Sequence, residues 1–384
     1  MKGSCYIEMD LNVLEDNYKH FAQFGKVYFP VKTNHNAIIL DKLKKCGSGF
    51  EVDSIEHMKK VLDDNTKSKI IYSNVAKSEE EIIWALENGV TFFTIDDGKT
   101  LNKILDNAIK LNIEKLKFNV RLNVFDIFKK QFIKKGVEDS RLGSSVKTCK
   151  ELLLRIKEEK RIKVFAGLSF YVQVEMHDKE NMLMVMAKYL TKHFDKSDNI
   201  SWLNIGGGSR IKSLQKYYFS LKNAISTIGI KEVILEPGRY MVDKVSNAYV
   251  SPTRVVHKDS FGGEMVVSLG LGLYHGLIDI KLHKRKFDIV LLHNDLEVKL
   301  KEMDYIKRII KKSYANSDTR DLRENKRLVL RGPTADSIDI IGIYEMPHVN
   351  ISESDTFCIK NIGAYMEVLI SSFSGSIQVE YKKK

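Results

Sequence analysis

Hydrophobic and polar residues follow two different rhythms over the first two thirds of the chain. Short runs rich in β-branched and aromatic residues are separated by longer stretches in which apolar residues recur every three or four positions. The first rhythm predicts buried strands and the second predicts amphipathic helices, such as SEEEIIWALENG, which ends at Gly89. The strand candidates are residues 27–32, 49–53, 69–74, 91–96, 117–123, 165–172, 201–208 and 232–240.

Eight strands that alternate with helices over about 215 residues are typical of a (β/α)8 barrel. An open doubly wound sheet also alternates strands with helices, but it rarely has eight such units. We therefore predict an α/β chain in which residues 11–240 form the barrel.

After residue 240 the pattern changes to short strands with few helices between them. This pattern predicts a second, mainly antiparallel β domain over residues 241–384. A charged stretch at 296–316 is the exception, and the strand within residues 1–10 is expected to join this domain. The strand candidates are residues 249–257, 264–273, 287–293, 327–332, 339–346, 355–361 and 376–382.

Composition and charge exclude several classes of protein. Hydrophobic residues make up 43% of the chain and charged residues 29%, as in folded globular proteins. No apolar run approaches the roughly 20 residues of a membrane span, and the first residues do not resemble a secretory signal. The four cysteines are scattered, which argues against a zinc site or a disulfide framework and favours a cytoplasmic location. A net charge of +12 without a nucleic-acid reading module fits an anionic substrate or cofactor better than a nucleic acid.

Reactive groups in such barrels lie at the C-terminal ends of the strands. An apolar strand, VYFPVK, delivers Lys32 to this edge, and we expect its site to be buried. Burial lowers the pKa of a lysine and makes it a nucleophile toward aldehydes, whereas the alternative is a solvated lysine on a loop. The other groups at predicted strand ends are Asn34, Glu51, Asp53, Asn74, Asp96, Arg121, Tyr171, Gly206 to Gly208, Glu236 and Arg239.

Two turns have the composition needed to hold a phosphorylated ring. In IGGGSR, three consecutive glycines after a buried strand allow backbone N–H groups to approach a phosphate, although a tight turn alone also explains them. In LEPGRY, Glu236 could face a ring nitrogen while Arg239 faces a phosphate. A carboxylate beside a pyridine nitrogen keeps that nitrogen protonated and strengthens the ring as an electron sink.

These motifs resemble those of the ornithine/diaminopimelate decarboxylases, the fold-type III enzymes that use pyridoxal 5'-phosphate (PLP). The resemblance runs nearly end to end through VKTN, GFEVDS, NIGGGSR, LEPGRY, RGPTADSID and NIGAY. It implies PLP as the cofactor and Lys32 as the lysine that binds it as a Schiff base. The other cofactor-binding positions that it implies are Glu51 near this lysine, Arg121 in the active site, Gly206, Gly207, Gly208, Arg239 and Tyr365 at the phosphate, and Glu236 at the ring nitrogen.

The resemblance also implies a homodimer with shared active sites, in which Asp336 reaches the site of the partner subunit. Two positions depart from the family pattern on the catalytic side. Tyr171, followed by Gln173 and Val174, replaces a histidine that stacks on the cofactor, so that an aromatic face remains without an imidazole. Ala335 replaces the cysteine that returns a proton to Cα. Tyr171, His275, Asp336 or a bound water are the remaining candidates for this proton donor.

A third departure concerns the substrate's tail. Diamine-producing members of the family have an aspartate near the distal amine of the substrate. By the order of the motifs, the matching position in this chain is His283 of HKRK, or Asp279. A basic cluster repels a cationic tail and attracts an anionic one, whereas a solvated basic loop is the alternative. We therefore expect an amino-acid unit with an anionic or bulky tail, linked to a phosphate, nucleotide or carrier, and not free ornithine or lysine.

The resulting hypothesis is a PLP-dependent decarboxylase that removes the α-carboxylate of an amino-acid unit in a specialised pathway such as antibiotic biosynthesis. The decarboxylase of microcin C-type maturation is one family member that fits, and the decarboxylases of siderophore and aminoglycoside assembly are rivals. The alternatives are an ordinary free amino-acid decarboxylase, a non-catalytic pseudoenzyme, and an amino-acid racemase. Loss of the family's histidine and cysteine favours the pseudoenzyme, while retention of the cofactor residues argues against it.

Overall fold

The computed structural model describes residues 5–64, 69–125, 127–129, 141–172, 182–208, 211–258, 264–303, 327–375 and 377–384. Gln173, Val174 and most of the charged stretch at 296–316 lie outside these residues. The chain divides into two compact units, Leu14–Met241 and the combination of Met1–Val13 with Val242–Lys384.

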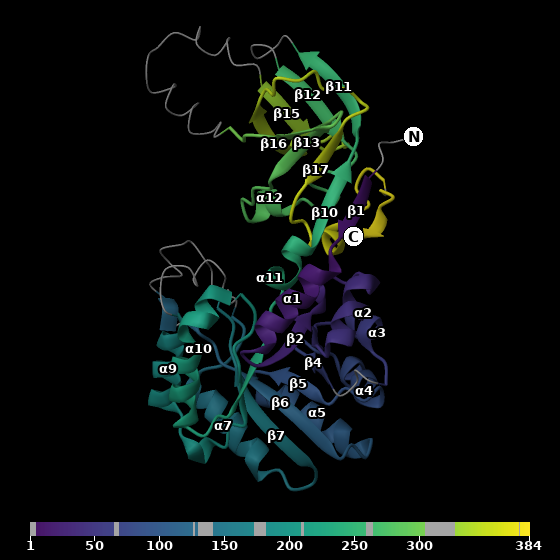
Figure 1. Ribbon diagram of the computed structural model, residues 1–384. Coiled ribbons are helices and arrows are strands. Elements are labelled where there is room, and N and C mark those ends of the chain that lie inside the picture. Colours follow the sequence, from purple (N-terminus) through teal and green to yellow (C-terminus); the bar gives the residue numbers. More distant parts are fainter. Residues whose placement is uncertain are drawn as a thin grey trace. The chain divides into compact units, whose positions relative to one another are not determined.

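The first unit is the predicted barrel, and its eight parallel strands close on themselves (Figure 1). All eight predicted strands are confirmed, with ends that differ by a few residues. The largest difference is at the end of the last strand, which was predicted to run to residue 240 but ends at Leu235. The rest of LEPGRY leads into a short helix that begins at Arg239. The strands are β2 (Lys26–Pro30), β3 (Gly49–Val52), β4 (Ile70–Tyr72), β5 (Phe92–Ile95), β6 (Lys115–Arg121), β7 (Lys163–Ser169), β8 (Trp202–Asn204) and β9 (Glu232–Leu235).

Aromatic side chains fill part of the barrel interior. The ring of Phe92 meets Tyr28 and Trp202 edge-on, at centroid distances of 6.1 Å and 5.2 Å, although the three residues come from β5, β2 and β8. Gly49 and Gly167 make room for them, because a Cβ there would lie 2.5 Å from the Tyr28 ring and 2.2 Å from the Trp202 indole nitrogen. This alternation of large and small residues gives a packed barrel and not a pore.

Helices cover the outside of the barrel, and several of them begin at the capping residues that the sequence provides (Figure 1). Ser78 and Glu81 form a reciprocal capping box at the start of one helix, and the Asp97 side chain accepts from two backbone N–H groups at the start of the next. The helices are α1 (Leu11–Ala22), α2 (Ala37–Cys46), α3 (Ile55–Val61), α4 (Glu79–Glu87), α5 (Gly98–Lys110), α7 (Val146–Glu158), α9 (Met182–His193), α10 (Ile211–Ser226) and α11 (Arg239–Val242), with 3-10 turns η1 (Val31–Thr33) and η3 (Lys196–Asp198).

The second unit contains two sheets, with strand orders β14-β13-β17-β10-β1-β18 and β11-β12-β15-β16. Most pairs are antiparallel, as predicted, but β1 pairs with β18 and β12 with β15 in parallel. The elements are β1 (Cys5–Met9), β10 (Ser246–Val250), β11 (Pro252–Lys258), β12 (Glu264–Leu269), β13 (Ile289–His293), β14 (Leu296–Lys299), β15 (Arg327–Arg331), β16 (Ile340–Glu345), β17 (Thr356–Ile359), β18 (Glu380–Lys383), α12 (Asp279–Leu282), η4 (Asp243–Val245) and η6 (Glu367–Leu369).

The charged stretch that begins at residue 296 was not predicted to contain a strand, and this prediction is wrong. Residues Leu296–Lys299 form β14, which pairs antiparallel with β13. Its side chains are mostly exposed. The apolar alternation that marks a half-buried strand is therefore weak here, which explains why the pattern failed to predict it.

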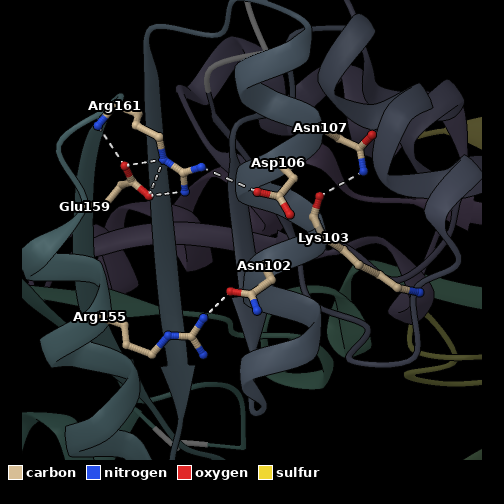
Figure 2. A network of polar contacts seen from close by, with 7 residues as sticks. All are labelled: Asn102, Lys103, Asp106, Asn107, Arg155, Glu159 and Arg161. Carbon is tan, nitrogen blue, oxygen red and sulfur yellow. Dashed lines mark hydrogen bonds and ion pairs between the residues drawn. The ribbon is translucent and has the colours of Figure 1, made fainter.

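A polar network joins α5 and α7 to the start of β7 (Figure 2). Arg161 donates to both carboxylate oxygens of Glu159, at 2.7–3.3 Å, and lies 3.7 Å from Asp106 of α5. Arg155 of α7 binds the side chain of Asn102. Asn102, Arg155, Glu159 and Arg161 border a hollow of about 420 Å³ at the connection that enters β7. This is the end of the barrel where residues serve stability and not catalysis.

Candidate active site

The predicted site residues of the barrel all lie at the C-terminal ends of its strands. Lys32 lies in η1 directly after β2, Glu51 lies within β3, and Glu236 directly follows β9. Because β9, β2 and β3 are neighbours, these three residues lie on one arc of the barrel. The others follow in order around the barrel: Asp53 after β3, Asn74 after β4, Asp96 after β5, Arg121 at the end of β6, Tyr171 after β7, Gly206 to Gly208 after β8, and Arg239 at the start of α11.

Lys32 lies between two carboxylates. Its Nζ atom is 3.2 Å from Oε1 of Glu51, to which it donates a hydrogen bond, and 3.7 Å from Oδ2 of Asp53. The expectation that Lys32 is buried with a lowered pKa is wrong for this structure. Its side chain is 48% exposed, and the negative charge of Glu51, followed by Asp53 and Glu236, outweighs desolvation and raises its pKa. Lys32 is therefore a charged ammonium that must lose a proton before it can act as a nucleophile.

Glu236 is the carboxylate that most needs a partner. Its Oε1 atom accepts a hydrogen bond of 2.7 Å from the side chain of Asn204, a residue of β8 that the sequence did not suggest. Burial, and then the like charge of Glu51, raises the pKa of Glu236 to about 7. A buried carboxylate with a raised pKa is stabilised by a proton donor or a cation. A protonated ring nitrogen would meet this need.

The glycine turn after β8 has a conformation that requires glycine. Gly206 and Gly208 have φ angles of 65° and 80°, in the left-handed region. A Cβ at Gly207 would lie 2.7 Å from the carbonyl oxygen of Glu236, and one at Gly206 equally close to that of Phe170. The turn therefore requires glycine for its own geometry. It is also compatible with a ligand, because within the described residues the amide groups of Gly207 and Gly208 have no hydrogen-bond partner.

Tyr171 packs against this turn. Its Cα and Cδ2 atoms lie 3.6 Å from the position that a Cβ on Gly206 would occupy, and its side chain is largely exposed. An aromatic ring therefore lies beside the candidate phosphate turn, at the position where the sequence lacks the family's histidine.

Lys77 is a further buried lysine at the same end of the barrel, and the sequence pattern did not indicate it. Its Nζ atom donates to the carbonyl oxygens of Asn74 and, at 2.7 Å, Thr94, and it lies 4.9 Å from the centre of the Tyr72 ring. Burial lowers the pKa of Lys77 to about 7. Its bonds join the ends of β4 and β5. The only sequence signal was its place, just after a strand and just before the Ser78 helix cap.

Asp336 of the second unit is held as a carboxylate. Its Oδ2 atom accepts a hydrogen bond of 2.5 Å from the Tyr274 hydroxyl, and its Oδ1 atom accepts one of 3.0 Å from the Ile338 N–H. The Tyr274 bond is the main cause that lowers the pKa of Asp336. An ionised carboxylate cannot donate a proton near neutral pH, so Asp336 is a poor candidate for the proton donor to Cα.

Asp339 builds the turn that carries Ala335 and Asp336. Asp339 is fully buried and accepts hydrogen bonds of 2.7 Å from the Thr334 hydroxyl and from the Leu273 N–H. The buried carboxylate of Asp339 therefore holds the turn in place, while Ala335 itself is exposed.

Three of the four side chains of the HKRK segment lie beside carboxylates of their own unit. His283 lies 2.9 Å from a carboxylate oxygen of Asp279, and Arg285 lies 2.8 Å from Asp243 and 3.7 Å from Asp279. Lys286 lies 2.7 Å from Glu302. Lys284 is exposed. The prediction of a basic cluster that attracts an anionic tail therefore depends mainly on this last residue.

Two further predicted residues lie in the second unit. Tyr365 has a φ of 66°, a left-handed conformation that is uncommon for a residue other than glycine and that often occurs at functional sites. His275 is buried, and its backbone N–H donates to the carbonyl oxygen of Gly272.

Within the described ranges, no helix has both the length and the apolar character needed to cross a bilayer. In the same ranges, no group of three or more His, Cys, Asp or Glu side chains is placed to hold a metal ion.

Comparisons with known proteins agree on one family. The family model "Pyridoxal-dependent decarboxylase, pyridoxal binding domain" matches residues 11–243. A diaminopimelate decarboxylase of Campylobacter jejuni is 24% identical over 291 residues, which cover 73% of this chain and 71% of the relative. An ornithine decarboxylase of Schizosaccharomyces pombe is 22% identical, over 97% of this chain and 82% of the relative. The crystal structure of the arginine decarboxylase of Paramecium bursaria Chlorella virus shares the fold, with a TM-score of 0.75 at 19% identity over 100% of this chain and 97% of the other.

Proposed function

This chain belongs to the pyridoxal-dependent decarboxylase family, and on that premise we propose that it removes the α-carboxylate of an amino acid whose tail carries an anionic group. The observation that carries the decarboxylase proposal is the arc of Lys32, Glu51 and Glu236 at three adjacent strand ends. It places a lysine beside a buried carboxylate and near a second carboxylate that needs a proton or a cation.

The residues of the barrel fit PLP. Lys32 would hold it covalently, the amide groups of Gly207 and Gly208 with Arg239 would bind its phosphate, and Glu236 would bind its ring nitrogen. When bound, PLP supplies an electron-poor ring that accepts the electron pair released as CO2 leaves the substrate. Glu236 would keep a proton on the ring nitrogen, because a partly buried carboxylate favours a positive partner.

The proton that returns to Cα must come from another group. Asp336 is ionised and therefore cannot supply this proton near neutral pH. Tyr171, His275 and bound water remain as donors. The Tyr171 ring beside the glycine turn can cover one face of the cofactor site.

The tail specificity is the finer part of the proposal. The net charge of +12 and the exposed Lys284 support an anionic tail, whereas the contacts of His283 and Arg285 with carboxylates argue against a strong preference. The relatives named above act on diaminopimelate, ornithine and arginine, and they give no support to the hypothesis of a specialised antibiotic pathway.

Release of CO2 from a panel of amino acids tests this proposal. We expect diaminopimelate and amino acids with a phosphate at the end of the tail to exceed ornithine, lysine and arginine in kcat/KM. Lys284→Asp should raise the KM of an anionic substrate by roughly fivefold, as expected when one exposed charge is reversed. Lys281→Asp, on the neighbouring α12, is the matched control and should leave the KM unchanged. Faster turnover of free ornithine or lysine would refute the anionic tail while leaving the decarboxylase assignment intact.

We also propose that the chain acts as a homodimer that shares its active sites, with Asp336 serving the partner subunit. The support for this comes from the family motif RGPTAD and from the commonness of paired subunits. Mixing inactive Lys32→Ala and Asp336→Ala subunits should restore about a quarter of the activity, since random pairing gives half mixed dimers with one intact site each. A monomer in sedimentation, or no recovery on mixing, would contradict this proposal.

A further inference from the structure

Asp53 divides its two carboxylate oxygens between Lys32 and a histidine that the family motifs do not assign. Its Oδ2 atom lies 3.7 Å from Nζ of Lys32, and its Oδ1 atom lies 2.6 Å from Nδ1 of His57. Asp53 directly follows β3, and His57 lies one turn further along, in α3. The side chain of Ser54 caps this helix by accepting from the His57 N–H at 3.2 Å, which fixes the histidine's backbone. Lys32, Asp53 and His57 thus form a continuous chain of polar groups.

The two carboxylates beside Lys32 have different surroundings. Glu51 is almost completely buried, with its side chain 3% exposed, whereas the side chains of Asp53 and His57 are 33% and 19% exposed. A proton placed on Glu51 would be held in the interior. Asp53 lies partly open to the site and is held on one side by His57. It is therefore the better placed of the two to take up and release a proton while the site is in use.

The charge on Lys32 means that a group must remove a proton from it before it can react. Lys32 is held as an ammonium, mainly by Glu51, and cannot attack an aldehyde until it loses a proton. The contact with His57 is the main cause that lowers the pKa of Asp53, so Asp53 is an ionised carboxylate and a weak base that would hold a proton only in passing. Among the described residues, the neighbouring charged or titratable groups include Glu51 and Glu236 on the side of Lys32, Tyr72 near Asp53, and His35, which itself lies near Lys60, on the side of His57.

We propose that Asp53 carries the proton of Lys32 during covalent attachment of the cofactor and that His57 positions Asp53 for this transfer. The inference rests on the proposed function. One proton passes from Nζ through Oδ2 of Asp53 to the aldehyde oxygen, and a second leaves the nitrogen for the same oxygen. The carbon–oxygen bond breaks, the oxygen departs as water, and a carbon–nitrogen bond to Lys32 takes its place. The third proton stays on nitrogen, so that the net charge is unchanged.

The rate of covalent attachment can be measured without any substrate. Cofactor-free protein is mixed with PLP in a stopped-flow instrument, and the absorbance of lysine-bound PLP is followed. We expect Asp53→Asn to slow attachment about 100-fold, the lower range for a lost acid–base group. His57→Ala should slow it about tenfold, and added imidazole should restore the rate with a saturable dependence on its concentration. Affinity for pyridoxine 5'-phosphate, which has no aldehyde, should change less than about twofold in both variants.

His35→Ala is the matched control. The two histidine rings are 6.4 Å apart at the barrel rim, and this variant should keep the wild-type rate. If Asp53→Asn speeds attachment, Asp53 serves only to hold Lys32 charged and the proposal is wrong. A His57→Ala variant that imidazole does not rescue, or an equal loss of pyridoxine 5'-phosphate affinity, would show a purely structural role and also overturn it. Wild-type protein that never attaches PLP would instead refute the proposed function itself.

Discussion

Lys32→Ala is expected to reduce decarboxylation by at least about 1000-fold, as removal of a covalent catalytic group commonly does. The variant cannot attach the cofactor, and it leaves Glu51, with its buried side chain, without its ion-pair partner at 3.2 Å. Release of CO2 from the best substrate, measured under single-turnover conditions with excess PLP, gives the size of the effect.

Lys60→Ala provides the control for Lys32→Ala. Lys60 is an exposed lysine of α3 at the same end of the barrel, and its removal should change kcat by less than about twofold. Activity in the Lys32→Ala variant close to the wild-type rate would contradict the role of Lys32, provided that circular dichroism shows the barrel to be intact.

Glu236→Gln is the second change with a large expected effect. Glutamine keeps the hydrogen-bonding shape but not the charge, so it no longer favours a proton on the ring nitrogen. We expect kcat to fall about 100-fold, comparable to loss of one preorganised electrostatic group. PLP should still attach to Lys32, because the glycine turn and Lys32 are untouched. Steady-state kinetics together with the absorbance of bound PLP separate the two effects.

The pH dependence of stability offers an independent check on Glu236. In the cofactor-free protein its pKa is raised to about 7, above the value of about 4.3 in an unfolded chain. The folded protein therefore binds the proton more tightly, so this group's stabilising contribution is full below pH 4 and is lost as the pH rises through 7. Glu236→Gln should remove this loss, and saturating PLP should reduce it. Wild-type and variant curves of equal slope between pH 5 and 8 would contradict the assignment.

The barrel was predictable from the sequence because each of its strands is buried on both faces. Runs such as Tyr28 to Val31 are continuously apolar, and helices with clear caps such as Ser78 separate them. The weak point was the exposed edge strand β14, where charged side chains hide the alternation. A strand at a sheet edge is defined by its hydrogen-bonded neighbour, and that information is absent from the local pattern.

The candidate site was predictable only in part, for a physical reason. The strand-end rule located Lys32, Glu51 and Glu236, since it depends on order along the chain. The charge state of Lys32 could not be predicted, because it depends on the distance to Glu51 and on how desolvation compares with three negative charges. Lys77 was missed for a similar reason: its bonds to two carbonyl oxygens are formed only when β4 and β5 lie side by side.

Mapping the lysine that carries the cofactor tests the central claim most directly. Lys77 is the competing candidate, since burial lowers its pKa to about 7 whereas the pKa of Lys32 is raised. The protein is saturated with PLP, reduced with borohydride, digested and examined by mass spectrometry. We predict a phosphopyridoxyl group on the peptide that contains Lys32 and on no other. Modification at Lys77, or no modification at any lysine, would contradict the account.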